Sequence, residues 1–517
     1  MTAKDRIQQI RDLMLSDLVE REVPIRLALL AALAGEHLLL VGPPGTAKSL
    51  VSRRLQLAFA DAPYFERLLT RFTVPEELFG PLSVKALEND RYERLTERYL
   101  PTASIAFLDE IFKANSAILN ALLTLLNERE FDNGTQRVDV PLIAVIGASN
   151  ELPKEKELEA LFDRFLLRLH VGPVTKEGFD QLLTLRGQPT PTIDQALKLT
   201  RQDLKTFQFA AEKVGVPPEI VKLLGELREF CLANKLPVSD RRWRKVVKLL
   251  QTSACTNGRD AVNIWDCWLL QHCLWNSPDD RQKVYDWYAE RVGASESADP
   301  KELLEVVVSW EGALARDTTE KSQRRDEQGR LLYINAHGQF VPENKGDVQL
   351  RRSGEPLFIA SDQLILTSYH SNHREKFNDG NGYTRNELLN KYNLDRLTPE
   401  KKAAYFNEPA NWMMTPGAFA PAVEPTRHKP SYIKDCLSEL NEELIKVSSF
   451  REELRNHVKD LEGEILSHLW VTSEFLTPAL GCLNVTLGKV TTLHKRLKAV
   501  VDGYGALPQD KKVGGKA

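Results

Sequence analysis

The stretch HLLLVGPPGTAKS, residues 37–49, decides the fold of this chain. Its four apolar residues 38–41 lead directly into the glycine-rich run GPPGTAKS, and a helical pattern follows. Strand, glycine-rich turn and helix, in that order, are typical of a phosphate-binding loop. Two more strand-like runs, SIAFLDE at 104–110 and PLIAVIGASN at 141–150, are each followed by a helical pattern. This alternation predicts an α/β core, in which helices cover a parallel sheet.

The loop residues suit a triphosphate and its metal ion. Gly42 and Gly45 let the backbone turn so that its amides face the phosphates, at the positive end of the following helix. Lys48 supplies a mobile positive charge, and the Ser49 hydroxyl is a ligand for Mg²⁺. Ala47 stands where the general pattern has its last glycine, and we expect it to have helical dihedrals that tolerate a methyl. The expected nucleotide-binding set is Gly42, Pro43, Pro44, Gly45, Thr46, Ala47, Lys48, Ser49 and Leu50.

Polar residues end the other two strands. We expect Asp109 to hold Mg²⁺ through water and Glu110 to polarise the attacking water. Two acids at a strand end are a weak signal alone, but about 60 residues after a phosphate loop they are a strong one. Asn150, at the end of the third strand, is expected to orient that water; the alternative is an ordinary turn residue.

Two arginines in ALFDRFLLRLH, residues 160–170, are candidates for stabilising the transition state of phosphoryl transfer. Arg164 and Arg168 are four residues apart, which predicts that they share one helical face. The planar guanidinium spreads positive charge over phosphoryl oxygens. Such a finger, supplied by a neighbouring subunit, implies a ring. The alternative for each arginine is pairing with nearby acids.

A further basic cluster lies in VSDRRWRK, residues 238–245. The pattern predicts the start of a helix, where Ser239 or Asp240 is a suitable cap. From there Arg241 or Arg242 would reach back to the γ-phosphate, and the sequence does not choose between them. A solvated basic face is the alternative.

The bulk composition narrows the function classes. At 517 residues the chain is too long for a single hydrophobic core. Its 69 basic and 72 acidic residues give a net charge of −3, so no global positive field favours nucleic acid. Charges interrupt the N-terminal segment, and no stretch reaches the ~18 apolar residues of a membrane span. Six scattered cysteines favour reduced thiols. We expect a cytoplasmic protein without a transmembrane segment; peripheral membrane contact stays open.

The second half of the chain changes character twice. Short strand-like runs such as LLYINAHGQFV, EPLFIA and QLILTSY precede a regular helical pattern after Pro430. We expect an α/β core at 1–175, an all-α lid at 176–295, a discontinuous three-helix arm at 296–325 and 430–505, and a small, mainly β insertion at 326–429. The spaced leucines of the arm are expected to pack within the chain; the alternative is an intermolecular coiled coil.

Taken together, these motifs resemble the AAA+ ATPases. GPPGTAKS, FLDEIFKANSAILNALLTLLNEREF and ASNELP are similar to the MoxR branch, and TRFTVPEELFGPLS and VSDRRWRKVVKLLQ to its RavA subfamily. The resemblance covers roughly residues 20–280 and implies an ATP hydrolase that uses ATP and Mg²⁺. It places the motif residues at Lys48 and Ser49 (first nucleotide motif), Asp109 and Glu110 (second), Asn150 (first sensor), Arg164 (finger) and Arg241 (second sensor).

The resemblance also implies an assembly. RavA-like proteins form hexamers, act on protein clients in a chaperone-like way, and work with a partner that carries a von Willebrand factor A (VWA) domain, as ViaA does. Tyr92 lies where the family has a hairpin that points toward the ring pore. In enteric members the inserted domain contacts a lysine decarboxylase. Residues 325–425 match that domain in no stretch that we identify, which puts this partner in doubt.

Two other function classes compete with this interpretation. One is an interaction scaffold in which the nucleotide only sets assembly; Glu110 and Arg164 argue against it, because a pure switch need not retain both. The other is a ring motor that acts on DNA. The near-neutral net charge of the chain argues against this class.

Overall fold

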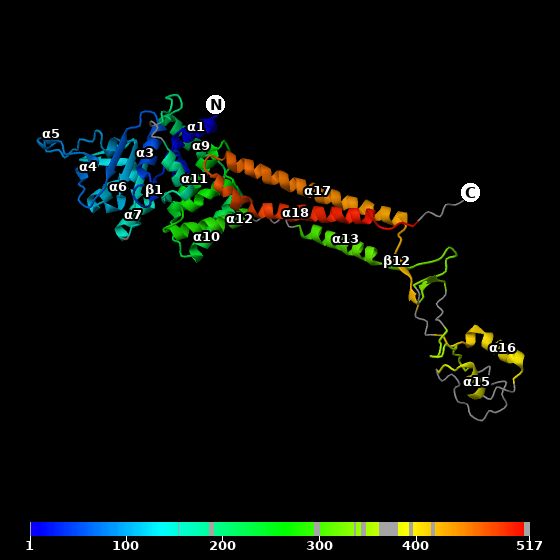
Figure 1. Ribbon diagram of the computed structural model, residues 1–517. Coiled ribbons are helices and arrows are strands. Elements are labelled where there is room, and N and C mark those ends of the chain that lie inside the picture. Colours follow the sequence, from blue (N-terminus) through cyan, green and yellow to red (C-terminus); the bar gives the residue numbers. More distant parts are fainter. Residues whose placement is uncertain are drawn as a thin grey trace. The chain divides into compact units, whose positions relative to one another are not determined.

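The architecture was established from a computed structural model (Figure 1). It describes residues 2–153, 155–185, 191–293, 300–335, 338–342, 348–360, 381–391, 397–414 and 419–510. The chain divides into two compact units. The first comprises Met1–Asp299 with Arg451–Lys489, and the second Pro300–Phe450 with Val490–Ala517.

A parallel sheet forms the centre of the first unit. Its five strands have the order β2-β3-β6-β1-β7, and all neighbours are parallel. The strands are β1 (Leu38–Val41), β2 (Tyr64–Leu68), β3 (Ile105–Asp109), β6 (Ala144–Ser149) and β7 (Leu167–His170). The expected parallel sheet is therefore confirmed. Because β3, β6 and β1 are neighbours, the residues that follow them meet at one edge of the sheet.

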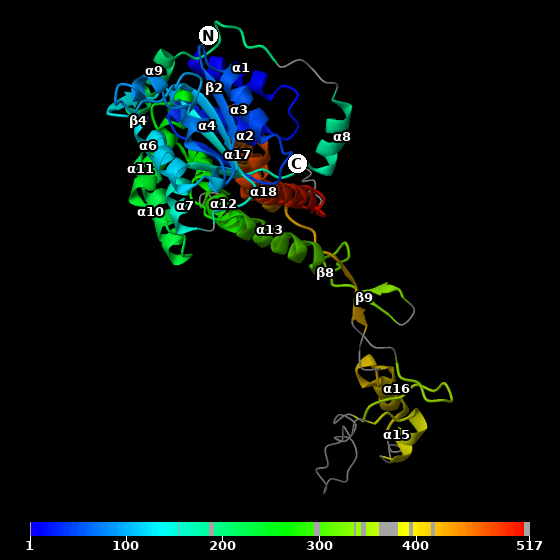
Figure 2. The same ribbon diagram turned by 90° about the vertical axis from the view of Figure 1, so that its left-hand side faces the viewer.

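Helices cover both faces of this sheet. Side chains alternate between the faces along each strand: Leu38 and Leu40 pack in one hydrophobic cluster, Leu39 and Val41 in another. The first cluster contains α1 (Ala3–Leu15), α2 (Glu22–Ala34) and α3 (Lys48–Leu57), which lie together in Figure 2. The second contains α4 (Pro75–Phe79), α6 (Ser116–Glu128) and α7 (Lys156–Arg164). Two short strands, β4 (Glu130–Asn133) and β5 (Gln136–Asp139), form a hairpin after α6.

A helical lid follows the sheet. After α8 (Lys176–Thr184) come α9 (Arg201–Ala211), α10 (Pro218–Ala233), α11 (Asp240–Thr256), the 3-10 helix η3 (Ile264–His272) and α12 (Pro278–Gly293). Their apolar side chains join the cluster that contains α1, α2 and α3. The all-α lid expected from the sequence is confirmed. Among the described residues, none of the helices combines the length and the apolar character that crossing a membrane requires.

Two long helices form a hairpin near the C-terminal end. They are α17 (Pro430–Ser467) and α18 (Leu476–Gly505). In the second unit Leu440 and Val447 of α17 pack with Val490 and Leu497 of α18, and Val307 of α13 (Lys301–Thr319) joins them. These apolar side chains therefore pack within the chain, as expected. The hairpin turn belongs to the first unit, where Trp470 and Phe475 are buried in the main cluster.

The inserted segment mixes strands with helices. Its strands are short: β8 (Lys321–Gln323), β9 (Tyr333–Ile334), β10 (Phe340–Val341), β11 (Ala420–Pro421) and β12 (Val423–Pro425). The described residues also form α15 (Arg385–Lys391) and α16 (Pro399–Asn407), so the mainly β expectation is wrong there. Thr398, which caps α16, and Pro399 at its first position were local signals for a helix. The run QLILTSY, residues 363–369, lies outside the described residues.

Candidate functional site

The phosphate loop joins β1 to α3 in a shape that only glycine permits at its first position. Gly42 has a φ of 155°, and a Cβ there would lie 2.1 Å from the carbonyl oxygen of Val171. The Gly42 amide donates a hydrogen bond to the Ser149 carbonyl oxygen, 2.9 Å away. Gly42 is thus fixed between the strand ends of β6 and β7, which leaves no room for a side chain.

Lys48 lies inside the turn of this loop. Its Nζ donates hydrogen bonds to the carbonyl oxygens of Gly42 at 2.7 Å and Pro43 at 2.8 Å. Burial lowers the pKa of Lys48, while the carboxylates of Asp109 and Glu110 oppose that shift. The lysine, the loop carbonyls and the two acids therefore lie close enough to interact electrostatically.

Ala47 departs from the expectation made for it. Its φ of 65° and ψ of 23° lie in the left-handed region, not the helical one. A side chain there costs roughly 1–2 kcal/mol relative to glycine. The expectation of helical dihedrals is wrong because Ala47 precedes the first residue of α3 and still belongs to the turn. The glycine of the general pattern would fit this position with less strain.

The acids and the asparagine meet beside the loop. Asn150 Nδ2 donates a hydrogen bond to Glu110 Oε1, and Lys113 Nζ lies 3.3 Å from Glu110 Oε2. Lys48 Nζ lies 3.5 Å from Asn150 Oδ1. Glu110 is only 7% exposed and has a φ of 53°. Left-handed backbone at a non-glycine residue is a strain found preferentially at functional sites.

Arg168 does not share a helical face with Arg164, contrary to the expectation. Arg164 is the last residue of α7, Phe165 leaves the helix with a φ of −85° and a ψ of 101°, and Arg168 lies in β7. The Arg168 side chain is 2% exposed and donates to the carbonyl oxygens of Phe162 and Trp275. The Arg168 guanidinium is thus used in hydrogen bonds within the fold, whereas Arg164 is partly exposed.

The structure also separates Arg241 from Arg242. Arg242 is 5% exposed and donates to the carbonyl oxygens of Phe165, Leu166 and Cys273, as well as to Asp163 Oδ1. Arg241 is exposed. Burial and the charge of Arg241 lower the pKa of Arg164. Within the described part of the chain, Arg164 Nε is buried without a hydrogen-bond partner. Arg164 and Arg241, the two remaining candidates for contact with phosphate, therefore lie near each other.

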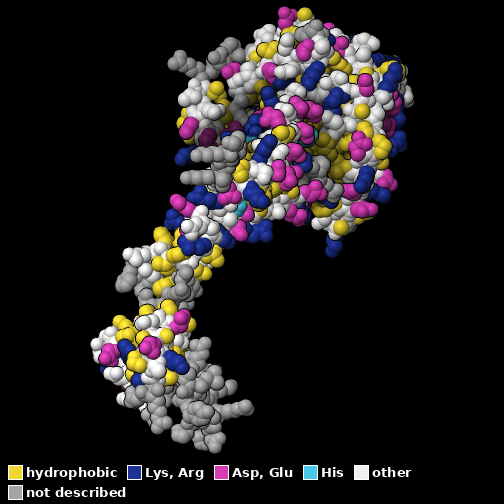
Figure 3. All heavy atoms as spheres, turned by 90° about the vertical axis from the view of Figure 1, so that its right-hand side faces the viewer, with side chains coloured by type: hydrophobic (Ala, Val, Ile, Leu, Met, Phe, Trp, Pro, Cys, Tyr) yellow, Lys and Arg dark blue, Asp and Glu magenta, His cyan; other side chains and the backbone are white. Residues whose placement is uncertain are grey.

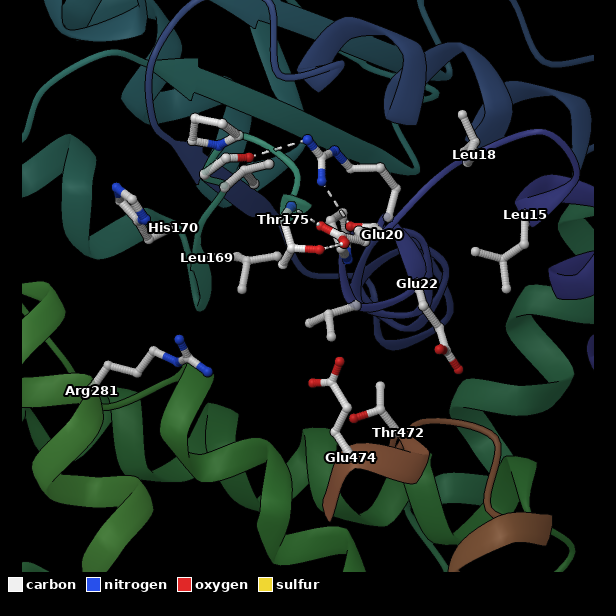
Figure 4. Close-up of a pocket in the computed structure, with 16 residues that line it drawn as sticks. Leu15, Leu18, Glu20, Glu22, Leu169, His170, Thr175, Arg281, Thr472 and Glu474 are labelled. Atoms are coloured by element: carbon white, nitrogen blue, oxygen red, sulfur yellow. Dashed lines mark hydrogen bonds between the residues drawn. The ribbon is translucent and has the colours of Figure 1, made fainter. Parts of the chain in front are cut away.

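A cavity of ≈ 610 Å³ opens beside the loop (Figure 4). Arg21, in its wall, donates from Nε to the Thr46 carbonyl oxygen at 3.0 Å and from Nη2 to the Gly172 carbonyl oxygen at 3.1 Å, which ties the wall to the phosphate loop. Its volume is in the range of small-molecule sites. The apolar lining residues are Leu15, Leu18, Val23, Pro24, Leu169, Val171 and Pro173.

Sequence reasoning missed this cavity. Its opposite wall comes from Arg281 in the lid and from Thr472 and Glu474 in the hairpin turn. These residues are separated from the loop by more than two hundred positions. Neither a local motif nor a periodicity connects them to it, so a prediction would have needed the tertiary contacts of the hairpin turn.

Comparison with protein families assigns both parts of the nucleotide-binding region. Residues 5–208 match the MoxR domain in the MoxR-vWA-beta-propeller ternary systems, and residues 219–288 match the AAA lid domain. The fold and the loop define an α/β AAA+ core with an all-α lid. Within that class, the chain belongs to the MoxR-type AAA+ ATPases.

Several proteins share this region. The uncharacterized proteins MJ0079 and MJ0812 of Methanocaldococcus jannaschii are 43% and 44% identical over 296 and 285 residues, which are 56% and 54% of this chain and 76% and 74% of theirs. The structural protein ORF618 of Acidianus two-tailed virus is 32% identical over 145 residues, 27% of this chain and 24% of its own. A crystal structure of a provisionally assigned ATPase from Cytophaga hutchinsonii, 19% identical with a TM-score of 0.44, covers 54% of this chain and 90% of its own; this likeness is too loose to carry an argument.

Proposed function

We propose that this chain hydrolyses ATP to ADP and phosphate at the edge of the sheet where β1, β3 and β6 end. The observation that carries the proposal is the convergence of Lys48, Glu110 and Asn150, whose side chains interact directly or through one neighbour. The amides of residues 42–50 and the Lys48 ammonium would hold the β- and γ-phosphates. The cavity tied to the loop by Arg21, whose lining is part apolar and part polar, would take the base.

The donor set fits a magnesium ion. The Ser49 hydroxyl and the Asp109 carboxylate are hard oxygen ligands, and Mg²⁺ is commonly held by one or two such groups together with substrate phosphates. These two residues would hold it here. The chemistry that Mg²⁺ supplies when bound is neutralisation of charge on the phosphate oxygens.

Glu110 is the group that we assign to the water. The Asn150 amide and the Lys113 ammonium each contact one oxygen of its carboxylate, so the side chain is held in one orientation. A carboxylate fixed in this way can accept a hydrogen bond from an attacking water and position it for in-line displacement. Asn150 thereby keeps the carboxylate aligned and would lie beside the same water.

The arginines extend the proposal to an assembly. Arg164 would serve as the finger in a neighbouring subunit of a homo-hexameric ring, and Arg241 as the second sensor. The hydrogen bonds of the neighbouring arginines support this choice. The guanidinium groups of Arg168 and Arg242 donate to backbone carbonyl oxygens, whereas Arg164 Nε is buried without a partner among the described residues. An arginine supplied in trans is worth ~10³–10⁵ in rate.

The work done with this energy would be chaperone-like remodelling or maturation of protein clients in the cytoplasm. A partner with a VWA domain, of the ViaA type, is supported by the family model, which describes the MoxR domain of systems that contain a vWA component. The RavA subfamily is supported by the helical hairpin, the helix α13 and the segment inserted between them. On the face in Figure 3, basic and acidic side chains are interspersed, which favours a protein client over nucleic acid.

Nucleotide binding and turnover test the proposal together. Lys48→Ala is expected to abolish ATP binding, measured by isothermal titration calorimetry, and turnover, measured by phosphate release. The control is Lys205→Ala, an exposed lysine on α9, which should leave both unchanged. Unaltered ATP binding by the Lys48 variant would refute the site. ATP binding without any turnover by the wild-type protein would instead identify a nucleotide-switched scaffold.

The trans role of Arg164 has its own test. Neither Arg164→Ala nor Lys48→Ala rings should turn over ATP, but mixed rings of the two contain junctions with one intact phosphate loop and one intact arginine. Turnover should therefore return on mixing. Wild-type turnover by the Arg164 variant alone would exclude the finger, and sedimentation that stays monomeric with ATP would exclude the ring.

A further inference from the structure

Helix α8 exposes an apolar face. The large apolar side chains of this segment, Phe179, Leu182, Leu183 and Leu185, are all exposed, Phe179 to 51% and Leu183 to 67%. Within the described part of the chain, none of them belongs to a hydrophobic cluster, and Figure 2 shows α8 standing clear of the other helices. Residues three and four apart lie on one face of a helix, so Phe179, Leu182 and Leu183 form a single patch.

A helix as short as α8 needs a packing partner. Its nine residues fall short of the ~12–15 at which an isolated helix becomes even marginally stable in water. Most helices in proteins are stabilised by packing of an apolar face, but Gly178 is the only buried residue of α8. The apolar face of α8 therefore requires a cover that the described residues of this chain do not supply.

The first turn of α8 is fixed to the wall of the cavity beside the phosphate loop. The Thr175 amide donates to Glu20 Oε2 at 2.8 Å and the Thr175 hydroxyl to Glu20 Oε1, and both residues line the cavity (Figure 4). The Gly178 amide donates to the Thr175 hydroxyl at 3.1 Å, and a Cβ at Gly178 would lie 2.2 Å from Glu20 Oε1. This close contact sets the position of α8 beside the cavity.

The proposed ring brings a second copy of the chain to the same place. Arg164 of a neighbouring subunit acts on a nucleotide held by residues 42–50 only when the surface around Arg164 lies against the phosphate loop. The cavity wall that holds α8 is tied to that loop through Arg21. The neighbour that supplies the arginine would therefore lie beside the apolar face of α8.

The charges of the two surfaces are complementary. Arg164 and Arg241 lie near each other, and Arg244 is exposed one turn further along α11. Among the described residues, none of these three arginines forms an ion pair, so we call them the arginine face. Helix α8 exposes two acids, Glu177 and Asp180, against the single base Lys176. Acidic side chains thus flank the apolar patch that would meet this basic surface.

We propose that α8 is a docking helix between subunits, whose apolar patch and acids bind the arginine face of a second copy of this chain. The proposal rests on the proposed function, because the ring supplies the second copy. Such a contact is heterologous, so each chain binds one neighbour with α8 and the other with its arginine face. The bonds between Glu20 and Thr175 then join the subunit interface to the wall of the cavity.

Sedimentation velocity of the full chain with ATP and Mg²⁺ tests the proposal. Replacing Phe179 and Leu183 together by serine removes the centre of the patch and leaves the contact with Glu20 intact. The protein concentration at which half of the chains are assembled should rise at least tenfold. ATP should still bind to the unassembled variant, as measured by isothermal titration calorimetry, because its phosphate loop is unchanged. The matched control replaces Phe209 of α9 and Val221 of α10, which are also exposed, by serine and should assemble like the wild type.

A photo-crosslinking benzoylphenylalanine at position 183 identifies what covers α8. In the assembled protein, crosslinks should join two chains and lead to peptides of α7 or α11, which carry the arginine face. Crosslinks confined to one chain would overturn the proposal, because α8 would then pack on its own unit.

The outcomes separate this proposal from the proposed function. If the double serine variant assembles as tightly as the wild type while Lys48→Ala abolishes ATP binding, the role of α8 is overturned and the nucleotide site stands. Loss of ATP binding by the double serine variant would also overturn it, because α8 would then belong to the nucleotide site. A wild-type chain that stays monomeric with bound ATP would instead refute the ring, and the docking role with it.

Discussion

Replacement of Arg242 by alanine should cost the ATPase unit much of its stability, whereas the same change at Arg241 should not. The Arg242 guanidinium lies between lid and core and donates to the Cys273 carbonyl oxygen at 2.6 Å and to the Phe165 and Leu166 carbonyl oxygens at 2.9 Å. Alanine would remove these donors and leave buried oxygens unsatisfied, although the Phe165 oxygen would keep a hydrogen bond from Arg168 Nε at 3.1 Å. Each such group costs about 1–3 kcal/mol, and water entering the new cavity would satisfy some of them.

We therefore expect Arg242→Ala to destabilise the unit by about 3–5 kcal/mol, the range for a buried charge network that loses one member. Calorimetric unfolding should show this as a fall in the midpoint of roughly 6–15 °C. Arg241 is exposed, so Arg241→Ala should change stability by less than about 0.5 kcal/mol. Arg242→Lys keeps the charge but loses the fork of donors, and it should recover only part of the loss.

Equal midpoints for the two alanine variants would refute this reasoning. A selective loss of stability in the Arg241 variant would reverse the assignment and make Arg242 the candidate second sensor. Activity adds a second criterion, because Arg241→Ala should lower ATP turnover in a protein of wild-type stability.

Gly42→Ala should abolish ATP binding and lower stability, as judged by calorimetry, because the new methyl would lie 2.1 Å from the Val171 carbonyl oxygen. Ala47→Gly should raise the unfolding midpoint, because glycine relieves the strain of the left-handed φ of 65°. Glycine also gives the unfolded chain greater freedom, so the gain should be at most the equivalent of about 1 kcal/mol. A lower midpoint would show that Ala47 is not strained. Burial lowers the pKa of His37 and His468, so the folded chain binds fewer protons than the unfolded one, and its stability should fall as the pH drops below about 6.5. In urea unfolding between pH 7.5 and 5.5, His468→Gln should flatten this dependence, and an unchanged slope would exclude His468 as a contributor.

The sequence was sufficient to predict an element and its site residues wherever a strong local pattern specified them. The apolar run before Gly42 and the two acids after Leu108 each combine a strand with its terminal polar residues, and the structure places them at one edge of the sheet. The helical repeat of the hairpin was equally local. In each case side-chain periodicity and neighbouring residue types determine the element, so no tertiary contact was needed.

Where tertiary contacts decide, the sequence was insufficient. The run RFLLRLH contains neither glycine nor proline, so nothing local marks the end of α7 at Arg164 or the strand that carries Arg168. The choice between Arg241 and Arg242 depends on which side chain meets the carbonyl oxygens of residues 165 and 166. The cavity wall at Glu474 depends on a hairpin turn that docks from the other end of the chain.

The central claim is that Glu110 activates water for ATP hydrolysis at this site. Its most direct test is steady-state ATP turnover of Glu110→Gln, with ATP binding measured on the same preparation and Glu128→Gln, an exposed glutamate on α6, as the matched control. The amide keeps the size of the side chain but is a far weaker proton acceptor than the carboxylate. Turnover should fall at least ~10-fold while ATP still binds. Turnover equal to that of the wild type would contradict the assignment of Glu110.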